Sequence, residues 1–206
     1  IVGLVGGDHS TPYGLIRALG ARHAEFGILH IDAHCDLRDA YEGFEFSHAS
    51  IMFNVLRDVP QAVRIAQVGV RDFSEGEAAL AASSERIATF DDLSLAAARF
   101  RGETWDEQCR RIVGTLPREG YVSFDIDGLT FENCPHTGTP VSGGLTFNEA
   151  VWLLAVLARS GRRIIGFDVV EVCPAPDQRI DAITGARILW KLCGLTLASN
   201  AEKAGK

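Results

Sequence analysis

The sequence predicts an α/β fold in which a mainly parallel sheet is covered by helices on both faces. Short apolar runs alternate with longer amphipathic segments along the chain, which is the pattern of strands joined by helices. The runs are continuously apolar, as strands buried on both faces are. Metal-binding side chains follow several runs, and in such sheets ligands gather at the carboxyl ends of the strands. We expect one domain over residues 1–206.

Each element follows from its local pattern. The apolar runs predict six strands, over residues 2–5, 26–31, 62–68, 86–90, 121–124 and 163–167. Helical spacing predicts helices over residues 12–23, 48–56, 75–82, 105–116, 147–159 and 181–197. Ser10 or Thr11 is expected to cap the first helix, with Pro12 in its first turn. Residues 91–104 fit either a helix or a loop, and residues 199–206 are expected to form a frayed tail.

Composition narrows the class of protein. The net charge of −7 argues against nucleic acid as a partner. No apolar run approaches the ~18 residues of a membrane-spanning helix, so no membrane partner is expected. The five cysteines form no C-x-x-C pair, which favours a reducing cytoplasm over a disulfide framework.

The stretch Ile28–Asp36 is an apolar strand that leads into potential metal ligands. Asp32, His34 and Asp36 are spaced at i, i+2 and i+4. If the backbone stays extended, their side chains point to one side, while Cys35 points away and packs in the core. Two carboxylates with one imidazole suit Mn²⁺ better than a structural zinc ion. Taken alone, the pattern also fits an ordinary polar turn.

Two further strand ends carry residues of the same kind. Asp125 and Asp127 end one apolar run on a shared face, and His9 follows another. With the first three residues they make four carboxylates and two imidazoles, enough to hold two divalent cations close together. Without cations the four carboxylates would repel one another strongly.

A pair of cations predicts hydrolytic chemistry. A water molecule between two metal ions loses a proton near neutral pH and becomes a nucleophile. Asp36 is the carboxylate that we expect to pass that proton to a leaving amine.

Four motifs, in the right order and over nearly the whole chain, resemble those of the ureohydrolase family, which comprises arginase, agmatinase and their relatives. They are Gly6–Ser10, Asp32–Asp36, Ser123–Asp127, and Gly138–Pro140 with Gly143–Leu145. The resemblance implies a three-layer α/β/α fold, a centre of two Mn²⁺ ions, and hydrolysis of a guanidino group to urea and an amine. It implies that the ligands are His9, Asp32, His34, Asp36, Asp125 and Asp127.

The resemblance also implies roles outside the metal shell. Glu171 is similar to the acid that holds the guanidinium of the substrate, a suitable partner for that planar cation. His48 resembles a histidine that relays protons or contacts the substrate. Thr139 is expected to shape the pocket. Each residue also has a structural reading: Glu171 as a surface residue after a strand, and His48 as a helix cap or core residue.

Several departures from the family pattern bear on the substrate. Thr130-Phe131 replaces the usual Asp-Pro, and Ala49 replaces the glycine after His48. The loop at residues 41–47 lacks the arginase pattern, and Ser74 stands where arginases have an Asp. These differences favour the agmatinase-like branch and agmatine as substrate. Guanidinobutyrate, formimidoylglutamate and arginine stay open as substrates, as does a non-catalytic metal-binding homologue.

The remaining expectations concern assembly, metal and the start of the chain. The resemblance implies a homo-oligomer, a trimer or hexamer. Ni²⁺ or Co²⁺ could replace Mn²⁺, because oxygen and nitrogen sites overlap in metal preference. Family members carry further strands before the motif at Gly6–Ser10, so we expect a sheet without them.

Overall fold

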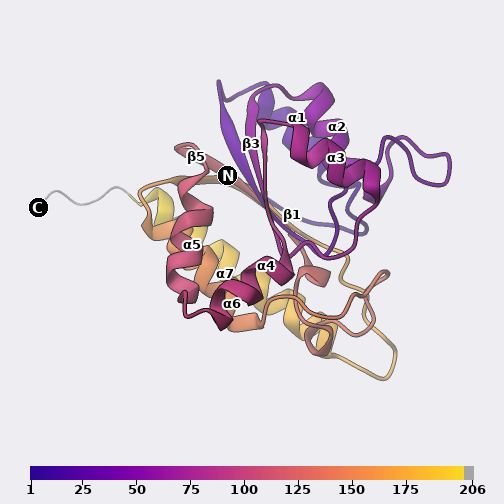
Figure 1. Ribbon diagram of the computed structural model, residues 1–206. Helices are drawn as coiled ribbons and strands as arrows, with labels where there is room; N and C mark the ends of the chain where they lie inside the picture. Colours follow the sequence, from indigo (N-terminus) through magenta and orange to yellow (C-terminus); the bar gives the residue numbers. More distant parts are fainter. Residues whose placement is uncertain (202–206) are drawn as a thin grey trace, which may run out of the picture.

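Six parallel strands form one sheet in the order β1-β6-β5-β2-β3-β4. The computed structural model describes residues 1–201, and Figure 1 shows the arrangement. The strands are β1 Val2–Val5, β2 Phe26–Ile31, β3 Ala62–Val68, β4 Ile87–Phe90, β5 Glu119–Asp125 and β6 Arg163–Val170. The expected parallel sheet is confirmed. β5 and β6 run longer than predicted, so that Asp125 and Asp168 lie within strands.

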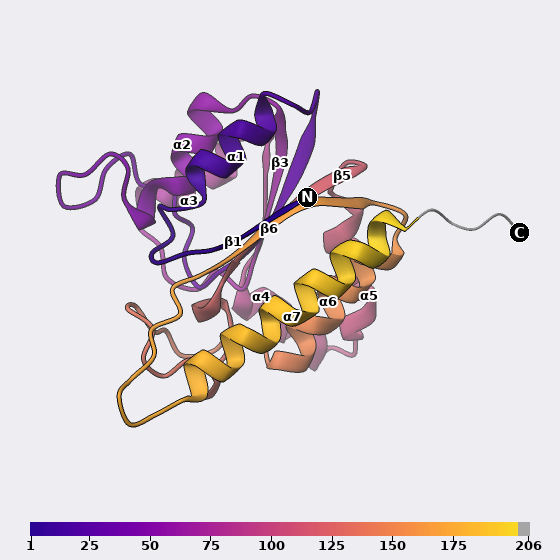
Figure 2. The same cartoon turned by 180° about the vertical axis from the view of Figure 1, so that it is seen from behind.

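Helices cover both faces of the sheet, as Figures 1 and 2 show from opposite sides. One layer contains α1 Tyr13–Gly20, α2 Ile51–Asp58 and α3 Glu75–Ser83. The other contains α4 Asp92–Phe100, α5 Trp105–Gly114, α6 Phe147–Arg159 and α7 Ile180–Asn200. Short 3-10 helices lie at His48–Ser50, Ile126–Gly128 and Phe131–Asn133. The three-layer α/β/α prediction is confirmed.

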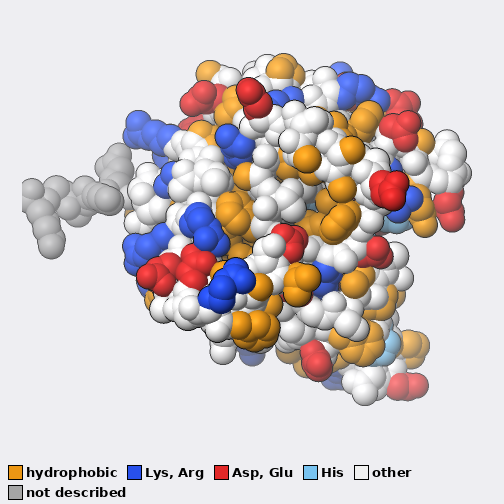
Figure 3. All heavy atoms as spheres, in the orientation of Figure 1, with side chains coloured by type: hydrophobic (Ala, Val, Ile, Leu, Met, Phe, Trp, Pro, Cys, Tyr) orange, Lys and Arg blue, Asp and Glu red, His pale blue; other side chains and the backbone are white. Residues whose placement is uncertain are grey.

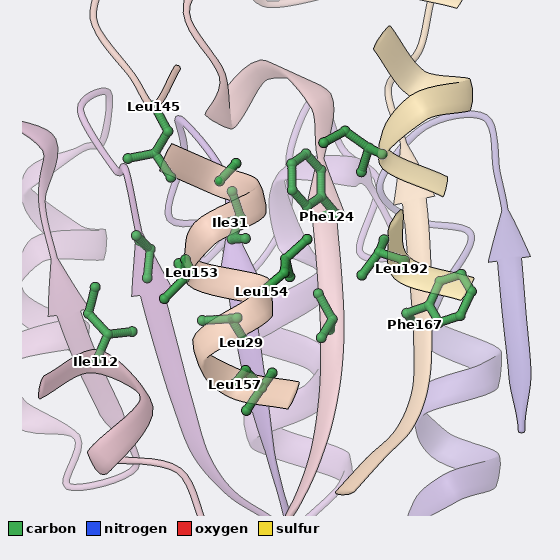
Figure 4. Close-up of a cluster of buried hydrophobic side chains, with 14 of the residues drawn as sticks. Leu29, Ile31, Ile112, Phe124, Leu145, Leu153, Leu154, Leu157, Phe167 and Leu192 are labelled. Atoms are coloured by element: carbon green, nitrogen blue, oxygen red, sulfur yellow. The ribbon is translucent and has the colours of Figure 1, made fainter. Parts of the chain in front are cut away.

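Each face of the sheet has its own apolar core, because successive side chains of a strand point to opposite faces. On β2, Ile28 packs toward α1 and α2, whereas Leu29 and Ile31 pack toward the other helix layer. Figure 4 shows Leu29 and Ile31 beside Leu153 and Leu154 of α6. Burying one such side chain contributes about 1.5–3 kcal/mol. The sheet is therefore held from both sides.

Three helices begin with reciprocal capping pairs, in which a hydroxyl accepts from the backbone three residues on and the glutamate there accepts in return. These pairs are Ser74 with Glu77, Thr104 with Glu107, and Thr146 with Glu149. The segment left open at residues 91–104 is mostly helix, since Asp91 caps α4 by accepting from the Ser94 N–H.

The prediction for the first helix is wrong at both ends. The hydroxyls of Ser10 and Thr11 donate to Asp8 instead of capping. α1 therefore starts at Tyr13, after Pro12, and ends at Gly20 rather than near His23.

The expected tail also differs. Ser199 and Asn200 belong to α7 and bond the backbone of Ile164, whereas residues 202–206 lie outside the described residues. Within residues 1–201, no helix is long and apolar enough to cross a membrane. Figure 3 shows acidic and basic side chains next to one another over α5, where Arg110 pairs with Asp106 and Arg111 with Glu103.

Candidate metal centre

The strand order brings the ends of β1, β5 and β2 to one edge of the sheet, and three carboxylates there surround His9. The His9 Nδ1 atom lies 2.9 Å from Asp32 Oδ2, 3.0 Å from Asp36 Oδ2 and 3.2 Å from Asp125 Oδ2. All four side chains are buried. This group offers one nitrogen and three oxygen donors to a single cation.

A second group adjoins the first and shares Asp32 with it. The His34 Nδ1 atom lies 3.2 Å from Asp127 Oδ2 and 3.4 Å from Asp32 Oδ1. Because Asp32 turns one oxygen to each histidine, the two groups can hold two neighbouring cations with a carboxylate between them. The structure therefore brings all six sequence-predicted ligands together.

The contacts of His9 show that these residues fit a metal ion. The Ser123 hydroxyl donates to Asp168 Oδ2 over 2.9 Å, so its oxygen is left to accept the Nε2–H of His9, also over 2.9 Å. With Nε2 bonded to Ser123, His9 turns Nδ1 toward three carboxylates. Against the effect of burial, these carboxylates raise the pKa of His9 well above its usual value. His9 Nδ1 and Asp36 Oδ2 are buried atoms that make no hydrogen bond within residues 1–201. A cation is the partner that such a donor set lacks.

Burial and mutual repulsion set the acidities. Burial raises the pKa of Asp36, and the charge of Asp32 raises it further. Burial, Asp127 and Asp32 likewise raise the pKa of Asp125. Burial would raise the pKa of Asp32 too, but the imidazoles of His30, His34 and His9 hold that pKa well below its usual range. Burial works against a charge on His34, yet Asp127 and Asp32 raise its pKa to about 11.

The geometry corrects one prediction from spacing. Asp32, His34 and Asp36 do not lie on one extended strand, because β2 ends at Ile31 and Asp36 adopts a left-handed φ of 55°. This turn sends Asp36 to the His9 group and His34 to the Asp127 group. Cys35 is 2% exposed and packs in the core, as predicted.

Asp125 and Asp127 separate in the same way. Asp125 ends β5, whereas Asp127 lies in the 3-10 helix that follows, so they do not share a face as predicted. A Cβ at Gly128 would lie 2.8 Å from the Asp32 backbone nitrogen. Glycine is therefore what lets this helix approach the end of β2.

His30 is a buried neighbour of the centre that the sequence prediction missed. It lies on β2 with its Nε2 atom 2.8 Å from Asp32 Oδ2. An isolated histidine within an apolar run gave little reason for notice. Its position two residues before Asp32, on the same face of the strand, is the signal that could have identified it.

A cavity of about 180 Å³ opens above the candidate ligands His34 and Asp36. Its wall consists of Arg38, Tyr41, His48, Ala49, Asp72, Glu77, Thr139, Pro140 and Val141. The ring of His48 meets that of Tyr41 edge-on at 5.3 Å. Thr139 Oγ1 lies 3.4 Å from Asp127 Oδ2. The structure thus places His48 and Thr139 beside the metal centre.

The sequence profile of the arginase family matches residues 1–194. The chain belongs to this family. Among curated relatives, it is 32% identical over 191 residues to an N(1)-aminopropylagmatine ureohydrolase of Thermus thermophilus, covering 93% of this chain and 61% of the relative. It is 33% identical over 202 residues to an agmatinase of Cronobacter sakazakii, covering 96% and 60%. The chain therefore spans about three fifths of the length of these relatives.

Solved structures agree on the arginase-family fold. A hypothetical agmatinase from Burkholderia thailandensis is 31% identical, with a TM-score of 0.74, over 95% of this chain and 58% of that one. The proclavaminate amidino hydrolase of Streptomyces clavuligerus is 24% identical, with a TM-score of 0.81, over 96% and 64%.

Glu171 is half-buried and is bonded to the backbone of His9, one of the candidate ligands of this arginase-family site. Its Oε1 atom accepts from the His9 N–H over 2.7 Å, and burial raises the pKa of its carboxyl group. Its left-handed φ of 59° is held by two bonds of its own backbone: its N–H donates to the Gly7 carbonyl, and its carbonyl accepts from the Thr137 hydroxyl. No hydrogen bond within residues 1–201 occupies Oε2, so this oxygen is available to a ligand.

Arg71 links the turn that contains the candidate ligand Asp127 to the cavity wall next to Thr139, a role that the sequence prediction also missed. Its guanidinium donates to the carbonyl oxygens of Gly69, Asp127, Leu129 and Val141. One side chain after β3 therefore fixes both the Asp127 turn and the segment next to Thr139.

Proposed function

We propose that this chain hydrolyses a C–N bond of a small guanidino compound, releasing urea and an amine, with the help of two Mn²⁺ ions. The observation that supports this most strongly is the unbonded His9 Nδ1 atom, which faces three buried carboxylates. Membership of the arginase family, whose relatives include agmatinases, supports the reaction class.

The two groups of ligands divide the work of holding the cations. His9, Asp32, Asp36 and Asp125 would hold one, and Asp32, His34 and Asp127 the other. Hard oxygen donors with one imidazole per site favour Mn²⁺, with Ni²⁺ or Co²⁺ as replacements. When bound, the two cations would supply Lewis acidity and lower the pKa of water held at the site.

Asp36 is the residue that we assign to proton transfer. It belongs to the first group of candidate ligands and also lines the cavity, so its carboxylate borders both the metal site and the space open to a substrate. A carboxylate there can take a proton from the attacking water and give it to the leaving amine. His48, on the same cavity wall, relays protons or contacts the substrate.

Glu171 is the proposed partner of the guanidinium, through its Oε2 atom. Charge-assisted hydrogen bonds from a planar guanidinium to a carboxylate are short and directional. Thr139, close to Asp127, completes the wall that orients the guanidino group. Together with His48 these residues would place the reacting carbon over the metal ligands.

Agmatine is the substrate that we propose first. The exposed Asp72 lines the cavity and makes no side-chain hydrogen bond or ion pair within residues 1–201, so it can receive the distal ammonium. The products would then be urea and putrescine, which places the reaction in polyamine synthesis. Arg38, on the same wall, favours 4-guanidinobutyrate as the second candidate, because its guanidinium can bind a carboxylate tail.

Assembly and location complete the proposal. The five cysteines are free, which supports a cytoplasmic protein. Ile183, Trp190 and Leu197 leave apolar side chains exposed along α7, which supports a homo-oligomer. The resemblance to the family favours a trimer or hexamer.

The test is urea release by the Mn²⁺-loaded chain from agmatine, arginine, 4-guanidinobutyrate and 3-guanidinopropionate, with formamide release from formimidoylglutamate. We expect turnover of agmatine, and none by an Asp127→Ala variant. Turnover of 4-guanidinobutyrate alone would select the second candidate. If the chain holds two metal ions and turns over none of these compounds, the result would contradict an enzymatic role and favour a non-catalytic homologue.

A further inference from the structure

His30 lies next to the candidate metal centre, and its position fits two roles, a metal ligand or a hydrogen-bond donor to a ligand. Its Nε2 atom is 2.8 Å from Asp32 Oδ2, and it lies close enough to His9, Asp32 and Asp36 to be a fifth ligand of the first cation. Alternatively, Nε2 carries a proton and donates it to Asp32. An imidazole nitrogen cannot do both, because a protonated nitrogen has no lone pair for a metal ion.

Gln67 on β3 decides between the two readings. Its Nε2 atom donates to the Cys35 carbonyl over 2.7 Å, and its Oε1 atom accepts from Thr89 Oγ1 over 3.2 Å. The Cys35 contact fixes the orientation of the amide, since a carbonyl oxygen can only accept, and the Thr89 hydroxyl can then donate to the amide oxygen. The amide therefore turns its NH₂ group to His30 Nδ1, at 3.3 Å.

A donor facing Nδ1 leaves that nitrogen no place for a proton. His30 is completely buried, and no other side chain within residues 1–201 is hydrogen-bonded to its Nδ1 atom. A neutral imidazole keeps its single proton on the other nitrogen. That nitrogen is Nε2, which faces Asp32.

We propose that His30 is a positioning residue of the metal centre and not a ligand: it donates its Nε2–H to Asp32 and so fixes the carboxylate that both cations share. The other Asp32 oxygen accepts from the His34 N–H over 2.7 Å. With a donor on each oxygen, the carboxylate is held in one orientation, and each oxygen would keep a lone pair for a cation. This inference rests on the metal centre proposed above, but not on turnover.

The positioning depends on a chain of contacts that crosses three neighbouring strands. Thr89 of β4 holds Gln67 of β3, Gln67 sets the proton position on His30 of β2, and His30 holds Asp32. Outer partners that orient ligands typically change metal affinity by about 10- to 100-fold when removed. Gln67 touches no candidate ligand side chain, although its amide also holds the Cys35 carbonyl next to Asp36. A loss of metal affinity on its substitution would therefore report positioning, through His30 or through that carbonyl, rather than coordination.

The first experiment locates the proton. In the chain loaded with diamagnetic Zn²⁺, which binds nitrogen and oxygen donors more tightly than Mn²⁺, long-range ¹⁵N–¹H NMR reads each histidine nitrogen. We expect the Nε2 atom of His30 to be protonated and its Nδ1 atom to be unprotonated. An unprotonated Nε2 atom would make His30 a ligand and overturn the inference.

The second experiment measures Mn²⁺ affinity by calorimetry. His30→Phe, which removes the donor, is expected to bind about 10- to 100-fold more weakly, and His30→Gln, which keeps an N–H, is expected to lose less. Gln67→Leu should weaken binding by about 10-fold. The matched control is Gln108→Leu, which should bind like the wild type. Gln108 is a buried residue of α5 whose side chain bonds only Leu95 within residues 1–201.

The outcomes separate this inference from the proposed activity. If Gln67→Leu and Gln108→Leu bind Mn²⁺ equally well, the positioning role is wrong. If the wild type binds two Mn²⁺ ions but releases no urea, the proposed activity fails while the affinities still decide the role of His30. If the wild type binds no Mn²⁺, both fail together.

Discussion

At the floor of the cavity, Asp32, Asp36, Asp125 and Asp127 leave the ends of two central strands and are at most 4% exposed. The outer wall is instead a loop at residues 37–47 that projects from the molecule (Figures 1 and 2) and leaves Phe44 69% exposed. The floor is fixed by neighbouring strands, whereas the loop depends on a few local contacts. The candidate ligands and the loop expected to select the substrate are therefore held by different contacts, so the loop can vary without disturbing the ligands.

Removal of a ligand from the floor should have the largest effect. Asp127→Ala is expected to reduce turnover at least ~10³-fold, because bound metal supplies several kcal/mol of transition-state stabilisation. Metal analysis and urea release measure this. The matched variant Asp72→Ala removes an exposed acid of the wall and should keep its metal while raising KM for agmatine. Equal metal loss in both variants would erase the distinction between floor and wall.

A methyl group placed between the two central strand ends should disturb the floor without removing a ligand. Gly128→Ala puts a Cβ 2.8 Å from the Asp32 nitrogen, and such overpacking costs about 1–3 kcal/mol. The temperature of thermal unfolding and the affinity for Mn²⁺ should both fall. Gly114→Ala, at the end of α5 with open space around it, is the control. Undiminished metal affinity in Gly128→Ala would show that the floor is less rigid than described.

Metal binding to the floor should strengthen as pH rises. The pKa of His34 is raised to about 11, so in the metal-free chain this imidazole holds a proton at neutral pH. A cation must expel that proton, and its apparent affinity therefore increases from pH 6 toward pH 8. Calorimetry in buffers of different ionisation enthalpy counts the protons released. Binding without proton release would contradict the raised pKa.

The smallest effect is expected at the wall. Arg38 is 3.5 Å from Glu77 and about two fifths exposed, and exposed charge pairs are worth about 0.2–1 kcal/mol. Arg38→Ala should therefore shift the ratio of kcat/KM for 4-guanidinobutyrate and agmatine by about five-fold or less, toward agmatine. Metal content should stay unchanged. A shift toward 4-guanidinobutyrate would remove Arg38 from the account of selectivity.

The three layers of the fold could be predicted from local patterns in the sequence. Continuous apolar runs gave all six strands, and hydroxyl–glutamate pairs such as Thr146 with Glu149 explain where helices begin. The start of α1 was predicted wrongly because the hydroxyls of Ser10 and Thr11 bond to Asp8 rather than to the helix, a choice that spacing alone does not reveal.

The sequence predicted which residues belong to the candidate site, but not how they divide into two groups of ligands. Asp and His side chains after apolar runs are visible in the sequence, and parallel strands bring such ends together. Their division into two groups depends on the left-handed φ of Asp36 and on the 3-10 helix that contains Asp127. The contacts of His30 and Arg71 are tertiary, joining segments far apart in the chain. Their roles as ligands and partners stay proposals.

The central claim is that the floor holds two cations that share Asp32. Mn²⁺ titration of the metal-free chain, with metal analysis and electron paramagnetic resonance, tests it most directly. We predict two Mn²⁺ ions per chain and a spectrum of an exchange-coupled pair, because one carboxylate lies between the two groups. One ion per chain, two uncoupled ions, or none would contradict the account.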